Sequence, residues 1–99
     1  MSDYIISQPA IRDLESISSY FADVNVEAGE KFLKEFSKRC QQLVSFPNIG
    51  RNYDDLQVGL RGLPLEGYVI LYRVTEDRIE IIRVANGRQD LQLLFDKFT

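Results

Sequence analysis

The clearest hydrophobic pattern in the chain is a pair of short apolar runs, 68–74 and 78–84, separated by the polar tripeptide 75–77. Both runs are rich in Ile, Val and Tyr, which favour extended backbone, and the tripeptide has the length of a hairpin connection. The pattern therefore predicts two antiparallel β-strands. Asn86 and Gly87 follow the second run, and because both tolerate positive φ they predict a turn that ends the hairpin.

Two longer segments before this hairpin carry apolar residues at helical spacing. The first extends from about 9 to 22, and Ser7 is placed to cap its N-terminus. In the second, Asn25 is the predicted cap, the apolar stripe continues to Leu43, and the breaker-rich segment 46–50 ends the helix. Because only a few residues connect them, the two helices should pack antiparallel as a helical hairpin. The stripes also place in the core Phe21, Phe32, Phe36, Cys40 and Phe46.

The remaining apolar segments complete an α+β plan. Residues 4–6 predict a first strand that joins the later sheet, and 60–64 predict a short strand whose Pro64 requires an edge or the strand's end. The polar segment 51–55 predicts a surface loop, and the apolar residues after Asp90 predict a short C-terminal helix. The order is β-α-α-β-β-β plus that helix, with an antiparallel sheet of three or four strands and the N-terminal helical hairpin packed on one face.

Composition limits the function classes. The chain has 99 residues, of which 44% are hydrophobic and 27% charged, as is typical of a single globular domain over residues 1–99. No apolar run approaches the roughly 20 residues that span a bilayer, and the N-terminus does not have the pattern of a secretion signal. We therefore expect a cytoplasmic protein without a membrane partner. The formal net charge of −3 argues against direct nucleic-acid binding, because phosphate contacts usually require a basic surface.

Histidine is absent from the chain, and Cys40 is its only cysteine. Ser-His-Asp and Cys-His catalytic arrangements are thereby excluded, and too few soft ligands remain for a zinc site. We expect no metal and no other cofactor. Cys40 lies on a helical apolar stripe, so it is expected to pack as a small hydrophobic residue.

Four segments of the C-terminal third form one motif: 67–74 (GYVILYRV), 78–84 (RIEIIRV), 87–90 (GRQD) and 94–95 (LF). This motif resembles the ParE branch of the ParE/RelE toxins, the toxin halves of bacterial type II toxin–antitoxin pairs that are often called plasmid stabilisation proteins. The resemblance extends over nearly the whole chain, although only this motif is specific. One departure is Asn86, because many ParE-like chains carry a His there.

The resemblance implies a toxin that inhibits DNA gyrase by binding and stalls it with cleaved DNA, so we expect no enzymatic activity. It also implies a cognate antitoxin whose disordered C-terminal segment folds along the toxin and blocks it. Neither face of the predicted sheet is fully polar, and in this family the antitoxin is the expected cover for the second face.

Arginines and one loop are the candidates for binding. Guanidinium groups bind carboxylates and phosphates bidentately, whereas the competing interpretation is a solvated strand face with cross-strand ion pairs. The loop 86–90 closes the sheet, where a rigid scaffold often presents function, although Asp90 is better explained as a helix N-cap. The predicted target- or partner-binding residues are Arg61, Arg73, Arg83, Asn86, Arg88 and Gln89. The predicted antitoxin-binding apolar surface consists of Leu91, Leu94, Phe95 and Phe98.

Two alternative functions remain open. A RelE-like ribosome-dependent endoribonuclease needs a base for the 2′-OH, an acid for the leaving oxygen and cations for the developing charge. Where RelE-like chains carry a strand arginine and a tail tyrosine, this chain has Val69 and Phe95, neither of which can transfer a proton. The other alternative is an attenuated toxin that acts only as an antitoxin-binding module. It predicts no growth arrest when the chain is expressed alone.

Overall fold

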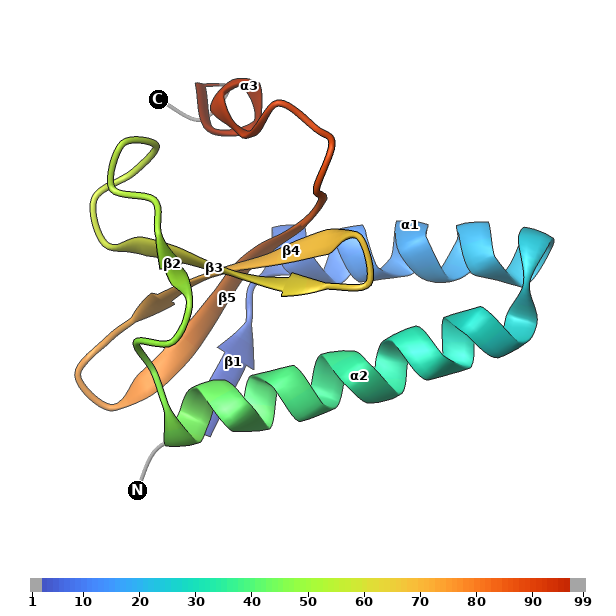
Figure 1. The fold of residues 1–99 in the computed structure, drawn as a ribbon, viewed down its shortest axis with the longest axis horizontal. Coiled ribbons are helices and arrows are strands. Elements are labelled where there is room, and N and C mark those ends of the chain that lie inside the picture. Colours follow the sequence, from blue (N-terminus) through green and yellow to red (C-terminus); the bar gives the residue numbers. More distant parts are fainter. Residues whose placement is uncertain (1–2, 97–99) are drawn as a thin grey trace.

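The helices and strands occur in the chain order that the hydrophobic pattern predicts, with one strand more. The computed structural model describes residues 3–96, and Figure 1 shows the helical hairpin on one side of a sheet and the C-terminal helix on the other. The α+β class is thereby confirmed. The elements are β1 (Asp3–Ile6), α1 (Gln8–Val24), α2 (Val26–Ser45), β2 (Arg51–Asn52), β3 (Leu60–Leu65), β4 (Tyr68–Val74), β5 (Arg78–Asn86) and α3 (Leu91–Asp96).

One five-stranded sheet with the order β1-β5-β4-β3-β2 forms the centre of the fold. Its neighbours pair antiparallel except for β1, which pairs parallel with β5. The predicted three or four strands become five because Arg51–Asn52, in the segment predicted as a loop, pairs with Arg61 and Gly62 of β3. A strand of two residues has no alternation that the sequence could reveal. Pro64 lies in the part of β3 that β2 does not pair with. One side of its backbone is therefore a sheet edge, which is the position that proline requires.

Both long helices begin at their predicted caps. Ser7 Oγ accepts a hydrogen bond from Ala10 N at 3.2 Å, and Asn25 Oδ1 accepts one from Ala28 N at 3.1 Å. Asn25 is also the whole connection between the helices, with an extended φ of −169°. One residue is therefore enough to reverse the chain and set α2 antiparallel to α1 (Figure 1).

The first core lies between the helical hairpin and one face of the sheet. Its largest fully buried side chains include Phe32, Tyr72 and Ile81. Cys40 is fully buried, as predicted, and burial raises the pKa of its thiol to about 12. The core also contains Phe36, with Phe21 packed against it. The prediction of a buried Phe46 is wrong: this side chain is 61% exposed, because it caps α2 at the point where the chain leaves the helix.

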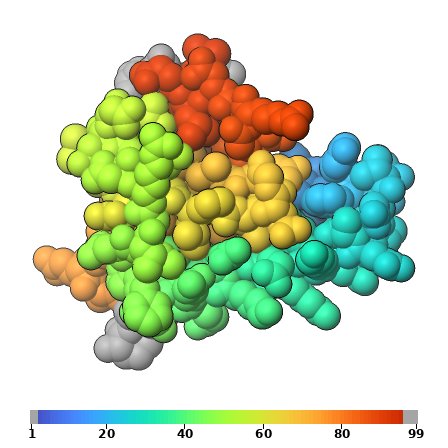
Figure 2. Space-filling model, viewed as in Figure 1, coloured from blue at the N-terminus to red at the C-terminus, as the bar shows by residue number. Residues whose placement is uncertain are grey.

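The second core lies on the opposite face of the sheet. Leu60, Leu71 and Ala85 of the strands pack there against Leu94 and Phe95 of α3. The loop between β2 and β3 also packs against this cluster, and Figure 2 shows that it forms one continuous surface with α3. The expectation that an antitoxin must cover this face is therefore wrong for these aliphatic side chains. The chain's own C-terminal helix covers them.

No helix within residues 3–96 combines the length and the apolar character that crossing a membrane requires.

Candidate partner-binding site

Arg83 of β5 is held by Asp13 of α1. Its Nε donates to Asp13 Oδ2 at 2.8 Å and its Nη2 donates to Oδ1 at 2.9 Å. The two side chains are only 18% and 16% exposed. These hydrogen bonds raise the pKa of Arg83 above its ordinary value, against the opposing effect of burial. A bidentate pair this sheltered can contact a partner only if Asp13 releases the guanidinium.

Asp13 also completes the edge of β5. β1 ends at Ile6, whereas β5 continues to Asn86, so the outer edge of β5 loses its neighbouring strand. Ser7 Oγ donates to the carbonyl of Ile82 at 2.8 Å, and Asp13 Oδ2 accepts from the N–H of Val84 at 2.9 Å. The start of α1 thus satisfies backbone groups that a longer β1 would have paired. Sequence reasoning missed this role because the partners are about 70 residues apart.

Arg61 and Arg73 are also used within the fold. Nη1 of Arg61 donates to two carbonyl groups of the loop 47–50, at 2.8 and 3.2 Å. Nη2 of Arg73 donates to Gln57 Oε1, and its Nη1 lies 4.0 Å from Glu80 Oε1. For these two residues and Arg83, the structure favours internal pairing over a cationic patch.

The loop after β5 contains the remaining predicted residues. Asn86 Oδ1 accepts from Arg88 N at 2.9 Å, and Asn86 O accepts from Gln89 N at 2.9 Å, which makes the predicted turn. A Cβ on Gly87 would lie 3.0 Å from the carbonyl oxygen of Gly67, so a glycine fits this close approach. Within residues 3–96, the exposed guanidinium of Arg88 has no hydrogen bond or ion pair, unlike those of the other three candidate arginines.

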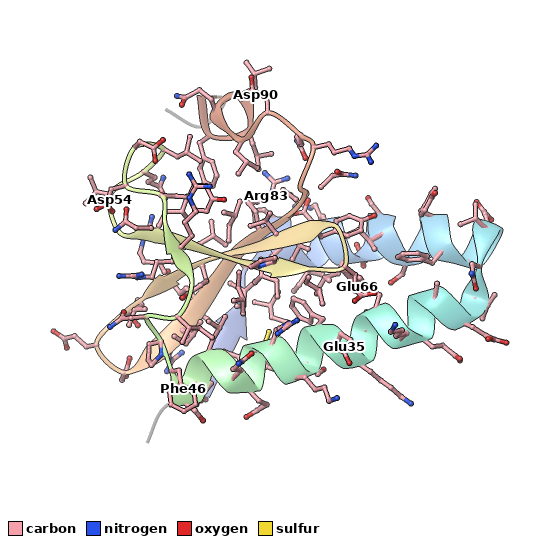
Figure 3. All side chains as sticks on the ribbon, in the orientation of Figure 1. Glu35, Phe46, Asp54, Glu66, Arg83 and Asp90 are labelled. Atoms are coloured by element: carbon pink, nitrogen blue, oxygen red, sulfur yellow. The ribbon has the colours of Figure 1, made fainter. Side chains whose placement is uncertain are left out.

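Asp90 behaves as the predicted helix cap. Its Oδ1 accepts from Gln92 N at 3.0 Å, and α3 begins at the next residue. Figure 3 shows Asp90 beside α3 and Arg83 nearer to the sheet.

A shallow hollow of about 290 Å³ lies where α1 meets the end of β5. It brings together two of the predicted residues, Asn86 and Gln89, with side chains of α1 and β4. Two phenols, Tyr20 and Tyr68, are among them, and neither is one of the predicted binding residues. No spacing in the chain links these two tyrosines, because only tertiary packing brings α1 beside β4 and β5. The lining residues are Asp13, Ser16, Ile17, Tyr20, Tyr68, Val84, Asn86 and Gln89.

The predicted apolar surface of the C-terminal helix is largely turned inward. Leu94 and Phe95 are only 8% and 6% exposed, and Leu91 packs against the same core. These residues face the sheet, so in this structure they are interior side chains, whereas Leu93 is the exposed leucine of α3. Phe98 lies outside the described residues.

The two positions that matter for a RelE-like ribonuclease also face the second core, where Phe95 is buried and Val69 is half-buried. Val69 and Phe95 both pack in the second core. The buried Tyr72 hydroxyl donates to Pro47 O at 2.7 Å and accepts from Gly50 N at 2.9 Å, and burial raises its pKa. Its proton is therefore committed to a structural bond. Over residues 3–96, no cluster of three or more His, Cys, Asp or Glu side chains is placed to hold a metal ion.

Comparisons with known proteins give the family and the fold. The family model described as "ParE toxin of type II toxin-antitoxin system, parDE" matches residues 4–91. The chain is 30% identical over 103 residues to Toxin ParE3 of Caulobacter vibrioides, with 100% of each sequence covered. Its fold is similar to a chain in the solved structure "Chromosomal ParDE TA system from P. aeruginosa", with a TM-score of 0.73 and 22% identity over 87% of this chain and 96% of that one.

Proposed function

The chain belongs to the ParE toxin family of type II toxin–antitoxin systems, and from that membership we propose that it inhibits DNA gyrase by binding and is neutralised by a cognate antitoxin. The observation that carries the proposal is the family match over residues 4–91, joined by a relative that aligns along its full length. Gyrase works in the cytoplasm, so we place the action of the protein there.

Inhibition by binding is consistent with the chemistry of the described residues. The exposed polar groups of the loop 86–90 offer hydrogen bonds and one guanidinium to a protein surface. The position equivalent to the RelE tail tyrosine holds the buried Phe95, which cannot act as an acid or a base. This arrangement supports a toxin that holds its target rather than one that cleaves RNA.

The helical hairpin offers a place for an antitoxin. A hollow of about 170 Å³ opens between α1 and α2 near their connection. It is mainly apolar, and Val26 and Leu33 at its border are exposed large hydrophobic residues. A segment that folds along the helices would bury these side chains, and that burial would offset part of the ordering entropy. The lining residues are Ser18, Phe21, Ala22, Val26, Gly29, Glu30 and Leu33.

The test uses the purified chain with gyrase, ATP and a supercoiled plasmid. We expect linear plasmid after detergent and protease treatment, since a stalled gyrase leaves its DNA cleaved. Prior addition of the cognate antitoxin should abolish the linear product. Unchanged supercoiling at a large excess of folded protein would reject gyrase as the target. Messenger RNA cleavage on translating ribosomes would then support the RelE-like alternative, and absence of growth arrest would support the attenuated toxin.

A further inference from the structure

A cluster of exposed apolar residues lies at the end of the molecule where α2 stops. Phe46 projects there from the end of α2 (Figure 3). Ile49 is brought close by a turn, in which its N–H donates to Phe46 O at 3.3 Å, and it is exposed as well. Pro47, which follows Phe46 in the chain, lines a hollow of about 180 Å³ together with the hairpin 74–79, where Val74 is exposed. Isolated exposed aliphatic residues are ordinary, but a grouped set that includes an aromatic marks an interaction surface.

The loop that presents these residues is fixed from beneath. The buried Tyr72 hydroxyl bonds Pro47 O and Gly50 N, and Arg61 bonds Asn48 O and Gly50 O. Gly50 sits so close that a Cβ there would lie 2.5 Å from Tyr72 Oη. Two side chains of the sheet thus hold the loop at both ends. Since the loop is ordered before a partner arrives, binding through it costs little conformational entropy.

The border of this surface is acidic. Glu76 and Asp77 are exposed at the tip of the β4–β5 hairpin, and Asp3 lies on the adjoining strand. Arg78 is shared between two of these carboxylates, at 3.9 Å from Asp3 and 3.8 Å from Asp77. Two carboxylates therefore share one guanidinium, and the exposed Glu76 adds negative charge at the same hairpin tip, which favours a partner with basic side chains.

The geometry points to a docking surface for the toxin's protein target, made of Phe46, Ile49, Val74, Glu76 and Asp77, which we call the Phe46 surface. The target is a protein that offers an apolar pocket to Phe46 and basic side chains to the two acids. A nucleic acid is disfavoured, because its phosphates would meet the same carboxylates. The Phe46 surface adjoins the start of β5, whereas the Tyr20–Tyr68 hollow lies at its other end. The identity of the target rests on the proposed function.

The test compares variants of the full chain in the gyrase assay. We expect that producing the same amount of linear plasmid takes at least about tenfold more Phe46→Ala protein than wild-type protein. A loss of this size is usual when a central aromatic anchor is truncated. The double variant Glu76→Lys, Asp77→Lys should lose potency to a similar extent. Val58→Ala removes an aliphatic side chain that is 83% exposed on another loop, and Glu15→Lys reverses an exposed acid on α1. Both control variants should match the wild type.

Antitoxin affinity and thermal melting of each variant separate the outcomes. We expect both to stay at the wild-type level, because the replaced side chains are exposed. A Phe46→Ala protein as potent as the wild type overturns the inference while the proposed function stands. Loss of antitoxin binding in that variant also overturns it and assigns the surface to the antitoxin. If the wild type leaves gyrase unaffected, the proposed function fails, and growth arrest becomes the readout for the same variants. If growth arrest persists with Phe46→Ala, the inference is overturned. It is also overturned if the wild type itself causes no arrest.

Discussion

Side chains that a sequence would assign to partner binding serve here to hold distant parts of the fold together. Arg83 connects β5 to α1 through its hydrogen bond to Asp13. Arg61 connects β3 to the loop after α2, and Arg73 connects β4 to the loop before β3. Each guanidinium has several donors in a fixed plane, which suits it to joining carbonyl and carboxylate groups from separate segments. Of the predicted arginines, Arg88 is the one whose side chain is exposed and lacks such a bond among the described residues.

Removal of the Asp13 carboxylate should destabilise the fold. Asp13→Ala removes the carboxylate that accepts hydrogen bonds from the sheltered guanidinium of Arg83 and from the N–H of Val84. Because a sheltered donor that loses its partner costs about 1–3 kcal/mol and two groups are affected, we expect the free energy of unfolding to fall by at least about 2 kcal/mol in urea denaturation. Glu15→Ala, on the exposed face of the same helix, should change it by less than about 0.5 kcal/mol. Equal stability of the two variants would contradict a structural role for the pair.

Cys40 should make stability depend on alkaline pH. Burial raises the pKa of its thiol from 9.0 to about 12, so the unfolded chain loses this proton first as the pH rises. The stabilisation is thus complete below about pH 9 and is lost between pH 9 and about 12, with a slope of up to about 1.4 kcal/mol per pH unit. Burial shifts the Tyr72 pKa in the same direction. In urea denaturation across this range, the free energy of unfolding should therefore decline less steeply with pH for Cys40→Ala than for the wild type. Parallel curves would show that Cys40 is not the source of the pH dependence.

Among the elements, the short α3 covers more of the sheet's apolar surface than its length suggests. It contributes two buried side chains to a core that would otherwise leave Leu60, Leu71 and Ala85 uncovered. The two-residue β2 is likewise small, yet it follows the loop that Tyr72 and Arg61 hold in place. Both elements depend on the sheet for their position, since neither is long enough to be stable alone.

Truncation of the α3 anchor should show how much this helix stabilises the molecule. Phe95→Ala removes a buried aromatic side chain from the second core, so we expect a loss of about 3 kcal/mol in the free energy of unfolding. Leu93→Ala, on the solvent side of the same helix, should change stability by less than about 0.5 kcal/mol. Thermal and urea unfolding of both variants measure the difference. Similar values for the two would show that α3 does not stabilise the sheet.

At the scale of the whole molecule, the candidate binding surfaces lie apart from one another. The helical hairpin carries an apolar hollow near its connection, the end of β5 carries a mixed hollow with two phenols, and the Phe46 surface lies at the opposite end of β5. A single domain of this size therefore has room for the proposed antitoxin and the proposed target on different residues. Mutagenesis of each surface separately identifies the partner that it binds.

A charge placed in the hairpin hollow should weaken the antitoxin selectively. Leu33→Glu puts a carboxylate at the border of the apolar hollow, where an antitoxin segment would have to desolvate it. We expect antitoxin affinity to fall by about tenfold or more, equivalent to about 1.4 kcal/mol, while the melting temperature stays near the wild-type value. Val58→Glu adds the same charge at another exposed position and serves as the control. Unchanged affinity of Leu33→Glu in titration calorimetry would exclude this hollow from the antitoxin interface.

Local chemistry was sufficient to predict most of the architecture. Periodicity located both long helices and the strands around 60–64, 68–74 and 78–84, since apolar spacing must match the repeat of the element that buries it. Capping chemistry located the starts of the helices at Ser7, Asn25 and Asp90. The motif at the C-terminal end was enough to indicate the family.

Tertiary structure decided which side chains remain exposed. The sequence shows Asp13 and Arg83 as separate polar positions, and only the placement of α1 against β5 pairs them. It shows Leu94 and Phe95 as an apolar surface, and only the docking of α3 buries them. It shows Phe46 as the end of an apolar stripe, and only the path of the chain after α2 exposes it. Helix and strand formation depends on neighbours in the sequence, whereas exposure depends on contacts between residues far apart in it.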